Sequence, residues 1–190
     1  MDFYSHDFYT KLNFSFDLTG IETNTSLLPH NGVFYKPQKY GISMLRDPNI
    51  KVTTNDTYLL TEDGRNKIIA QLPKSLINLE IPPQIAIMEM LATEESNDVY
   101  LPPHIDNVRV AAINVYLQTN GDETTYYHYS KGKVNPIFSF VANTGETYLL
   151  NVDKPHSVKL KSPAKRKILT ISFAKLSYEE VLNHVTSTSI

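Results

Sequence analysis

The residues of this chain best suited to carry chemistry are His104, Asp106 and His156. Two imidazoles and one carboxylate are ligands that divalent transition metals accept. His104 and Asp106 stand at positions i and i+2, and in a β-strand such residues project from the same face. His156, expected on a neighbouring strand, would complete the set. The spacing therefore predicts a metal site with three protein ligands on one side of the ion.

Three ligands on one side of a metal leave the opposite coordination positions open, and two histidines with one carboxylate are the ligand set of non-haem Fe(II) oxygenases. Arg166 stands ten positions after His156, just before an apolar strand expected over 168–173. A hairpin between the two residues would place both side chains in the same cavity. A guanidinium there can hold a carboxylate through two parallel hydrogen bonds.

Short apolar segments separated by turn residues dominate the second half of the chain and must position these side chains. Such segments predict strands at 85–92, 110–117, 124–129, 137–141, 146–151, 157–160 and 168–173. Asn120-Gly121 is typical of a tight turn, and it predicts that 110–117 and 124–129 pair as a hairpin. Many short strands with little helix between them favour an antiparallel sandwich or barrel.

Two helical patterns flank this β region. The apolar residues of 61–72 recur on one face of a helix, and Pro73 is expected to end it. Ser177 and Glu180 have the spacing of a capping box, which predicts a C-terminal helix reaching to about Val185.

The chain has 190 residues, which suits a single domain with one core. We expect an N-terminal flanking segment over 1–84, a β core over 85–174 and a C-terminal helix and tail over 175–190. Within the N-terminal segment, aromatic clusters at 14–16 and 33–35 predict short strands and loops packed against a core built elsewhere.

Composition excludes several classes of function. The formal net charge is -2 and no run of Lys and Arg is present, so neither nucleic acid nor a membrane surface is expected as a partner. No apolar run approaches the length of a membrane span, and no signal peptide is recognisable. The absence of cysteine excludes disulfides, thiolate zinc sites and cysteine nucleophiles. A cytoplasmic location is the resulting prediction.

The order His-x-Asp, His and then Arg resembles the 2-oxoglutarate- and Fe(II)-dependent dioxygenase superfamily, over roughly residues 85–174. Gly121-Asp122-Glu123-Thr124 is similar to the Gly-Gly-Glu-Thr stretch of prolyl-4-hydroxylase-like members. Gly145-Glu146-Thr147-Tyr148, which leads to Pro155-His156-Ser157-Val158, is similar to the aspartyl/asparaginyl β-hydroxylase branch. The resemblance implies a double-stranded β-helix, or jelly roll, with a few flanking helices.

The resemblance also implies roles for individual residues. His104, Asp106 and His156 would bind Fe(II), and Arg166 would pair with the distal carboxylate of 2-oxoglutarate. Further contacts to this cosubstrate are predicted on the strands that carry Asn114, Tyr116 and Thr170. The implied reaction uses O2 to hydroxylate a C–H bond of a peptidyl residue, an amino acid or a small metabolite. It releases succinate and CO2, with ascorbate as an auxiliary reductant.

Three other interpretations compete with this one. A nucleic-acid dealkylase of the same superfamily carries a second arginine where this chain has Ser172. A cupin-type enzyme usually has a His-x-His pair, which this chain lacks. The third alternative is a catalytically silent jelly-roll module with a binding or structural role. Such a module would not need the three metal ligands and the arginine together, which argues against it.

Three further residues have structural interpretations beside functional ones. Arg109 could meet an acidic group of the substrate, or form an ion pair with Asp98 or with the Asp106 loop. Glu89 is expected to face solvent or form a salt bridge within its apolar strand. His128 is expected to be a partly exposed strand residue.

Overall fold

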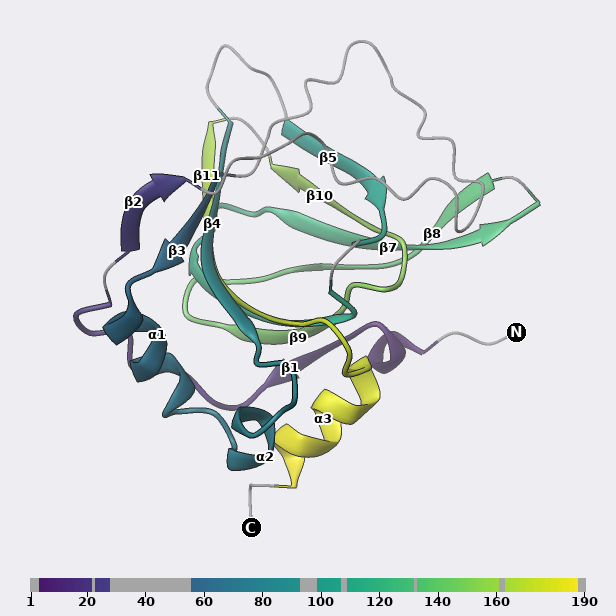
Figure 1. Ribbon diagram of the computed structural model, residues 1–190. Helices are drawn as coiled ribbons and strands as arrows, with labels where there is room; N and C mark the ends of the chain where they lie inside the picture. The colour runs from purple at the N-terminus through teal and green to yellow at the C-terminus, as the bar shows by residue number, and fades with distance from the viewer. Residues whose placement is uncertain are drawn as a thin grey trace.

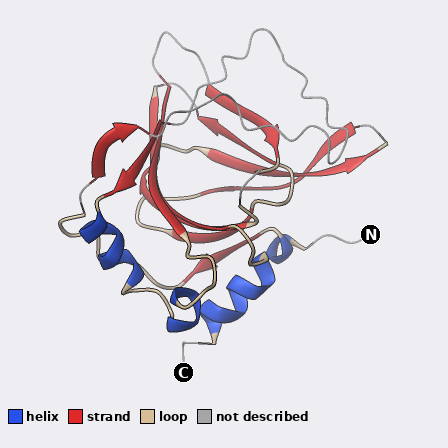
Figure 2. Ribbon diagram, in the orientation of Figure 1, coloured by secondary structure: helices blue, strands red, loops and turns tan. Residues whose placement is uncertain are grey.

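The computed structural model describes residues 4–21, 23–27, 56–92, 99–106, 109–131, 133–160 and 163–187. Two antiparallel β-sheets form the body of the protein, and short helices lie along one side of it (Figures 1 and 2). The larger sheet has the strand order β1-β9-β6-β11-β4-β3-β2, and the smaller sheet has the order β5-β10-β7-β8.

The larger sheet contains β1 (Tyr9–Leu12), β2 (Thr23–Leu27), β3 (Asp56–Leu60), β4 (Gln84–Ala92), β6 (Ala111–Gln118), β9 (Thr147–Asn151) and β11 (Ala164–Phe173). The smaller sheet contains β5 (Val99–His104), β7 (Glu123–Ser130), β8 (Lys133–Val141) and β10 (His156–Leu160). The helices are the 3-10 turn η1 (Ser5–Asp7) and the α-helices α1 (Glu62–Ile69), α2 (Lys74–Ile77) and α3 (Tyr178–Thr186). None of the helices in the described ranges is long and apolar enough to cross a membrane.

The eight strands from β4 to β11 define the fold class. Four of them pair as β4-β11-β6-β9 in the larger sheet, and the other four pair as β5-β10-β7-β8 in the smaller sheet. The chain passes from one sheet to the other at most of the connections, so the two sheets wind together. This arrangement is a double-stranded β-helix, and the predicted mainly β fold class is confirmed.

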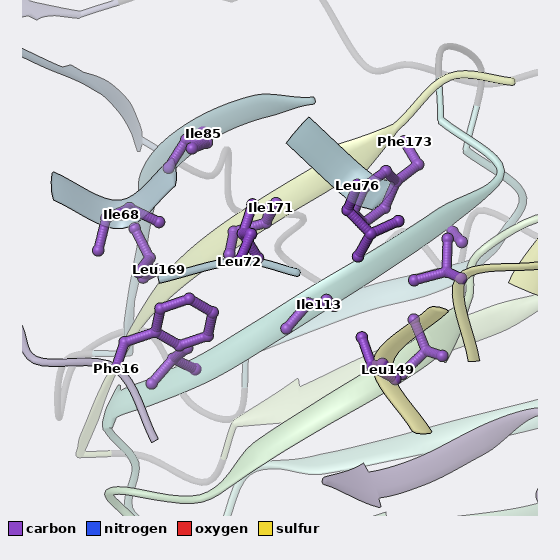
Figure 3. Close-up of a cluster of buried hydrophobic side chains, with 14 of the residues drawn as sticks. Phe16, Ile68, Leu72, Leu76, Ile85, Ile113, Leu149, Leu169, Ile171 and Phe173 are labelled. Atoms are coloured by element: carbon purple, nitrogen blue, oxygen red, sulfur yellow. The ribbon is translucent and has the colours of Figure 1, made fainter. Parts of the chain in front are cut away.

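Successive side chains of the central strands in the larger sheet point to opposite faces, and both sets are buried. Other parts of the protein therefore cover both faces of this sheet. On the outer face, residues such as Ile113, Leu149, Leu169 and Ile171 pack against the helices and the N-terminal segment (Figure 3). The three α-helices therefore lie beneath this sheet, as Figure 1 shows.

The inner face of the larger sheet packs against the smaller sheet. Tyr116, Tyr148 and Ile168 belong to one apolar cluster there, and Phe140 of β8 packs against it. Met90 of β4 contributes to a second cluster with residues of β10. This inner face carries the even-numbered residues of β6 and β11, which include all four predicted cosubstrate contacts.

The flanking helices differ in part from the prediction. The helix predicted over 61–72 ends at Ile69, where a turn follows, and Pro73 then stands at the N-cap of α2 rather than marking the end of helical structure. Proline suits that position because its fixed backbone angle and missing N–H are harmless at a helix start. The capping box of Ser177 and Glu180 is confirmed, with both reciprocal hydrogen bonds present.

The predicted hairpin pairings are wrong at two places. β6 and β7 lie in different sheets, so the turn at Asn120-Gly121 carries the chain across the fold, with Gly121 at a positive φ of 74° that favours glycine. β10 and β11 are likewise in different sheets and face each other. Local turn signals do not reveal that a neighbouring segment pairs with a more distant one.

The N-terminal aromatic cluster at 14–16 is one of the loops predicted to pack against the core, and not a strand. Phe16 is buried in the apolar cluster beneath the larger sheet, which also includes Ile68 and Leu76 of the helices. The cluster at 33–35 lies outside the described residues.

Candidate metal centre

His104 and His156 are brought together by the ladder between β5 and β10. His104 is the last residue of β5 and His156 is the first residue of β10, and the two are directly opposed in the antiparallel register. Their ring centroids are 4.4 Å apart. His156 is buried and His104 is half-buried. Cross-strand pairing thus places two imidazoles side by side.

Asp106 reaches the same place by a different route from the predicted one. β5 ends at His104, so Asp106 lies in the following loop and does not share a regular strand face with His104. Its backbone N–H donates to the carbonyl oxygen of Val152 at 3.1 Å, which ties the loop to the end of β9. The Oδ1 atom of Asp106 lies 3.5 Å from Nε2 of His104. The side chains of His104 and Asp106 therefore converge as predicted, but from a strand end and a loop and not from one strand face.

The three side chains form a cluster with the dimensions of a metal site. One ligand atom from each of His104, Asp106 and His156 lies within 4.8 Å of the others. Ligand bonds of about 2.0–2.2 Å to a shared ion would separate such atoms by roughly 3–4 Å. Small side-chain rotations would therefore bring all three atoms to bonding distance. The donor set fits a divalent transition metal held from one side.

The environment of His156 favours the form that binds metals. Burial, followed by the neighbouring His104 imidazole, lowers the pKa of His156 to about 3. The ring is therefore neutral at physiological pH. Its Nδ1 lies 2.9 Å from the carbonyl oxygen of Lys154, and with the proton on Nδ1 this contact leaves the Nε2 lone pair for a metal.

Arg109 holds the carboxylate of Asp106. Its Nε donates to Oδ2 of Asp106, so the ion pair predicted with the Asp106 loop is present; a contact with an acidic group of the substrate stays a prediction. Asp98, the other partner considered, lies outside the described residues. The Nη1 atom of Arg109 also donates to Oγ1 of Thr170 at 3.0 Å and to Oγ of Ser172 at 3.3 Å.

Arg109 also keeps the Asp106 carboxyl group ionised. Burial alone would raise the pKa of Asp106, but the Arg109 guanidinium and a hydrogen bond from His104 hold that pKa well below its usual value. The carboxylate is therefore ionised, as a metal ligand must be.

Arg166 points into the space between the sheets, but it meets another residue there. Its Nε atom lies 2.9 Å from Oδ2 of Asp122, and both side chains are buried, at 6% and 1% exposure. The guanidinium carbon lies 5.4 Å from the centroid of the Tyr116 ring. Whether Arg166 also binds a cosubstrate stays a prediction.

The remaining predicted contacts lie on the same inner face. Asn114 and Thr170 are cross-strand partners on β6 and β11, and both are buried. The Oδ1 atom of Asn114 and the hydroxyl of Tyr116 have no hydrogen-bond partner among the described residues. Buried polar groups are normally paired, so these atoms indicate a place where a polar ligand can bind.

Two residues near the site were not singled out from the sequence. The hydroxyl of Tyr126 is fully buried without a hydrogen-bond partner in the described residues, and its ring lies 5.8 Å from that of His156. Burial raises the pKa of Tyr126 well above its usual value, so the phenol stays protonated. Asp122 is the other, and its place directly after a turn glycine was the available signal.

Glu89 and His128 have the surroundings that their structural interpretations predict. Glu89 forms salt bridges with Lys165 and Lys167 on β11, at 3.1 and 2.8 Å, which confirms that interpretation. His128 is half-buried on β7, as expected for a partly exposed strand residue.

No family model and no curated protein matches this chain. Among solved structures, the chain is similar to an oxidoreductase of the 2OG-Fe(II) oxygenase family from Burkholderia pseudomallei, with 17% identity and a TM-score of 0.37. That match covers 50% of this chain and 43% of the other.

Two further matches have comparable scores. IDO from Bacillus thuringiensis is 13% identical with a TM-score of 0.39, over 68% of this chain and 81% of that one. Vicilin from Corylus avellana is 13% identical with a TM-score of 0.40, over 66% of this chain and 31% of that one. The chain spans less than half of the oxygenase and of the vicilin. At such low TM-scores, the chemistry of this chain has to be argued from its own residues.

Proposed function

We propose that this protein is an Fe(II)- and 2-oxoglutarate-dependent dioxygenase that hydroxylates a C–H bond of a peptidyl residue, an amino acid or a small metabolite, releasing succinate and CO2. The observation that carries the proposal is the convergence of His104, Asp106 and His156 within a double-stranded β-helix. Two imidazoles and a carboxylate on one side of an ion suit Fe(II) and leave positions open for small ligands.

Bound iron would supply the activation of O2. The protein's own residues would fix the ligands around it. Lys154 orients His156 through its carbonyl oxygen, and Arg109 holds the oxygen of Asp106 that is turned away from His104. Such second contacts keep ligand atoms in one geometry and one protonation state.

The inner face of the larger sheet supports the cosubstrate part of the proposal. Asn114 and Tyr116 present polar atoms there that have no partner within the described part of the chain, and Arg166 supplies a buried positive charge. We propose that Arg166 binds the distal carboxylate of 2-oxoglutarate, with Asn114, Tyr116 and Thr170 as further contacts along its length. A carboxylate could accept hydrogen bonds from the Tyr116 hydroxyl and from the Arg166 guanidinium, whereas Oδ1 of Asn114 would need a donor.

The test is a succinate-release assay with Fe(II), 2-oxoglutarate and O2, with ascorbate as the reductant, across a panel of peptides and amino acids. We expect release that requires both Fe(II) and 2-oxoglutarate and that is absent in His104→Ala. A peptide or amino acid that stimulates release identifies the substrate class. A protein that binds the metal but releases no succinate under any condition would exclude 2-oxoglutarate as the cosubstrate.

A further inference from the structure

The buried ion pair of Arg166 and Asp122 connects the two sheets. Arg166 belongs to β11 of the larger sheet, and Asp122 directly precedes β7 of the smaller sheet. Their separation of 2.9 Å makes Asp122 the nearest anion recorded for this arginine. The Asp122 carboxylate therefore pairs with the Arg166 guanidinium, to which the distal carboxylate of 2-oxoglutarate would bind under the proposed function.

The pair is poorly completed by its surroundings. Although the two charges are close, neither oxygen of Asp122 nor the Nε of Arg166 has a well-directed hydrogen bond to any described residue. The Nη1 atom of Arg166 lies 3.9 Å from the thioether sulfur of Met90, which is a weak acceptor. Burial raises the pKa of Asp122, and Arg166 and the backbone N–H groups of Asp122 and Asn120 oppose that shift without overcoming it. Buried charges are stable only when further hydrogen bonds satisfy them, so this pair can be exchanged for a better one.

We propose that Asp122 is a specificity-determining residue: its carboxylate competes with the distal carboxylate of 2-oxoglutarate for Arg166, so that a dicarboxylate binds only by displacing it. This inference rests on the proposed function. Two carboxylates on one buried guanidinium repel each other strongly. The bound ligand would give Arg166 a partner with two acceptor oxygens, which Asp122 does not provide in its present position.

Asp122→Asn tests this competition directly. This substitution removes the competing charge with little change in volume and leaves Arg166 without its anion. We expect about tenfold tighter binding of 2-oxoglutarate, with Mn(II) replacing iron under anaerobic conditions, because the ligand no longer has to displace a charged group. Binding of 2-oxopentanoate, which has the same length without the distal carboxylate, should be unchanged.

A matched set of variants keeps the test decisive. Glu123→Gln removes the same charge from the next residue and should leave both affinities as they are. Asp122→Asn can lower the melting temperature, because a lone buried cation is destabilising. Combining it with Arg166→Met removes both charges, which should restore the melting temperature and abolish the preference for 2-oxoglutarate over 2-oxopentanoate.

A metal-free measurement separates this inference from the proposed function. Glutarate has two carboxylates and no keto group, so it needs no metal to reach Arg166. It should raise the melting temperature of metal-free Asp122→Asn more than that of the wild type. Such a rise, seen even if the wild type binds no metal, would support the role of Asp122 while the proposed function fails. Equal or weaker binding of both glutarate and 2-oxoglutarate by Asp122→Asn would overturn the inference, whatever the metal site does.

Discussion

His104 and His156 oppose each other across the β5–β10 ladder, with 4.4 Å between their ring centroids. The backbone hydrogen bonds of two strands thus fix the distance between two imidazoles that are remote in the sequence. Burial, followed by the neighbouring His104, lowers the pKa of His156 to about 3, so the ring of His156 is neutral. The arrangement is prepared for a cation before any cation binds, since no proton has to leave His156 first.

Arg109→Met should weaken metal binding without abolishing it. Arg109 holds the second oxygen of Asp106, and loss of such a contact to a ligand typically costs about 10–100-fold in metal affinity. Competition between the protein and a chelator for Mn(II) measures the change. Arg65→Met, on α1 and outside the metal cluster, is the control and should bind as the wild type does. An Arg109→Met protein with undiminished affinity would show that Asp106 needs no support.

Arg166→Ala should mainly raise the concentration of 2-oxoglutarate required for activity. A charge-assisted hydrogen bond contributes about 1.5–3 kcal/mol, which corresponds to a change of roughly 10–100-fold. The measurement is succinate release as a function of 2-oxoglutarate concentration, with Lys159→Ala of the exposed face of β10 as the control. An unchanged requirement in Arg166→Ala would place the carboxylate anchor elsewhere.

Glu146→Gln should lower stability in a pH-dependent way. Glu146 accepts a hydrogen bond from the backbone N–H of Asn143 at 2.8 Å and forms an ion pair with Lys11. These two contacts lower the pKa of Glu146 from 4.5 to about 2. The folded protein therefore favours the ionised form more than the unfolded chain does. The resulting stabilisation is complete above pH 4.5 and is lost as pH falls towards 2.

Urea unfolding of the wild type and Glu146→Gln at several pH values tests this expectation. The two free energies of unfolding should differ by about 1–2 kcal/mol at pH 7, and the difference should shrink between pH 5 and pH 2. Glu123→Gln serves as the charge-matched control. A difference that stays constant down to pH 2 would contradict the assigned cause.

Ser177→Ala should destabilise the fold and leave the metal site intact. The Ser177 hydroxyl accepts from the backbone N–H of Glu180 at 3.2 Å and starts α3, which packs Tyr178 and Val181 into the core. Loss of an N-cap costs about 1 kcal/mol. Thermal unfolding measures the loss, with Ser187→Ala beyond the helix as the control. Identical melting temperatures would mean that packing alone holds the helix.

The sequence was sufficient for the fold class, because strand periodicity is a local property. Residue type and spacing also pointed to the cluster of His104, Asp106 and His156, although Asp106 reaches it from a loop and not from a strand face. It was misleading where long-range pairing decides. Asn120-Gly121 reads as a hairpin turn, yet the strands on either side join different sheets. Pattern alone cannot tell a turn within a sheet from a crossing between sheets.

The same limit explains what was missed around the site. Arg166 was predicted to pair with a carboxylate of the cosubstrate. In the structure it pairs with Asp122, because the chain crosses between the sheets at Gly121. Arg109 had several possible partners in the sequence, and only the loop after β5 determines that it meets Asp106. A contact between residues that meet only because the chain passes from one sheet to the other cannot be predicted from the sequence of either segment alone.

The most direct test of the central claim is an anaerobic calorimetric titration of the metal-free protein with Fe(II), in the wild type, His104→Ala, His156→Ala and the exposed control His6→Ala. The wild type and His6→Ala should each bind one ion per chain, and both cluster variants should lose that binding while keeping the far-ultraviolet circular dichroism of the folded protein. Undiminished binding in either folded cluster variant would contradict the assignment of these side chains as metal ligands.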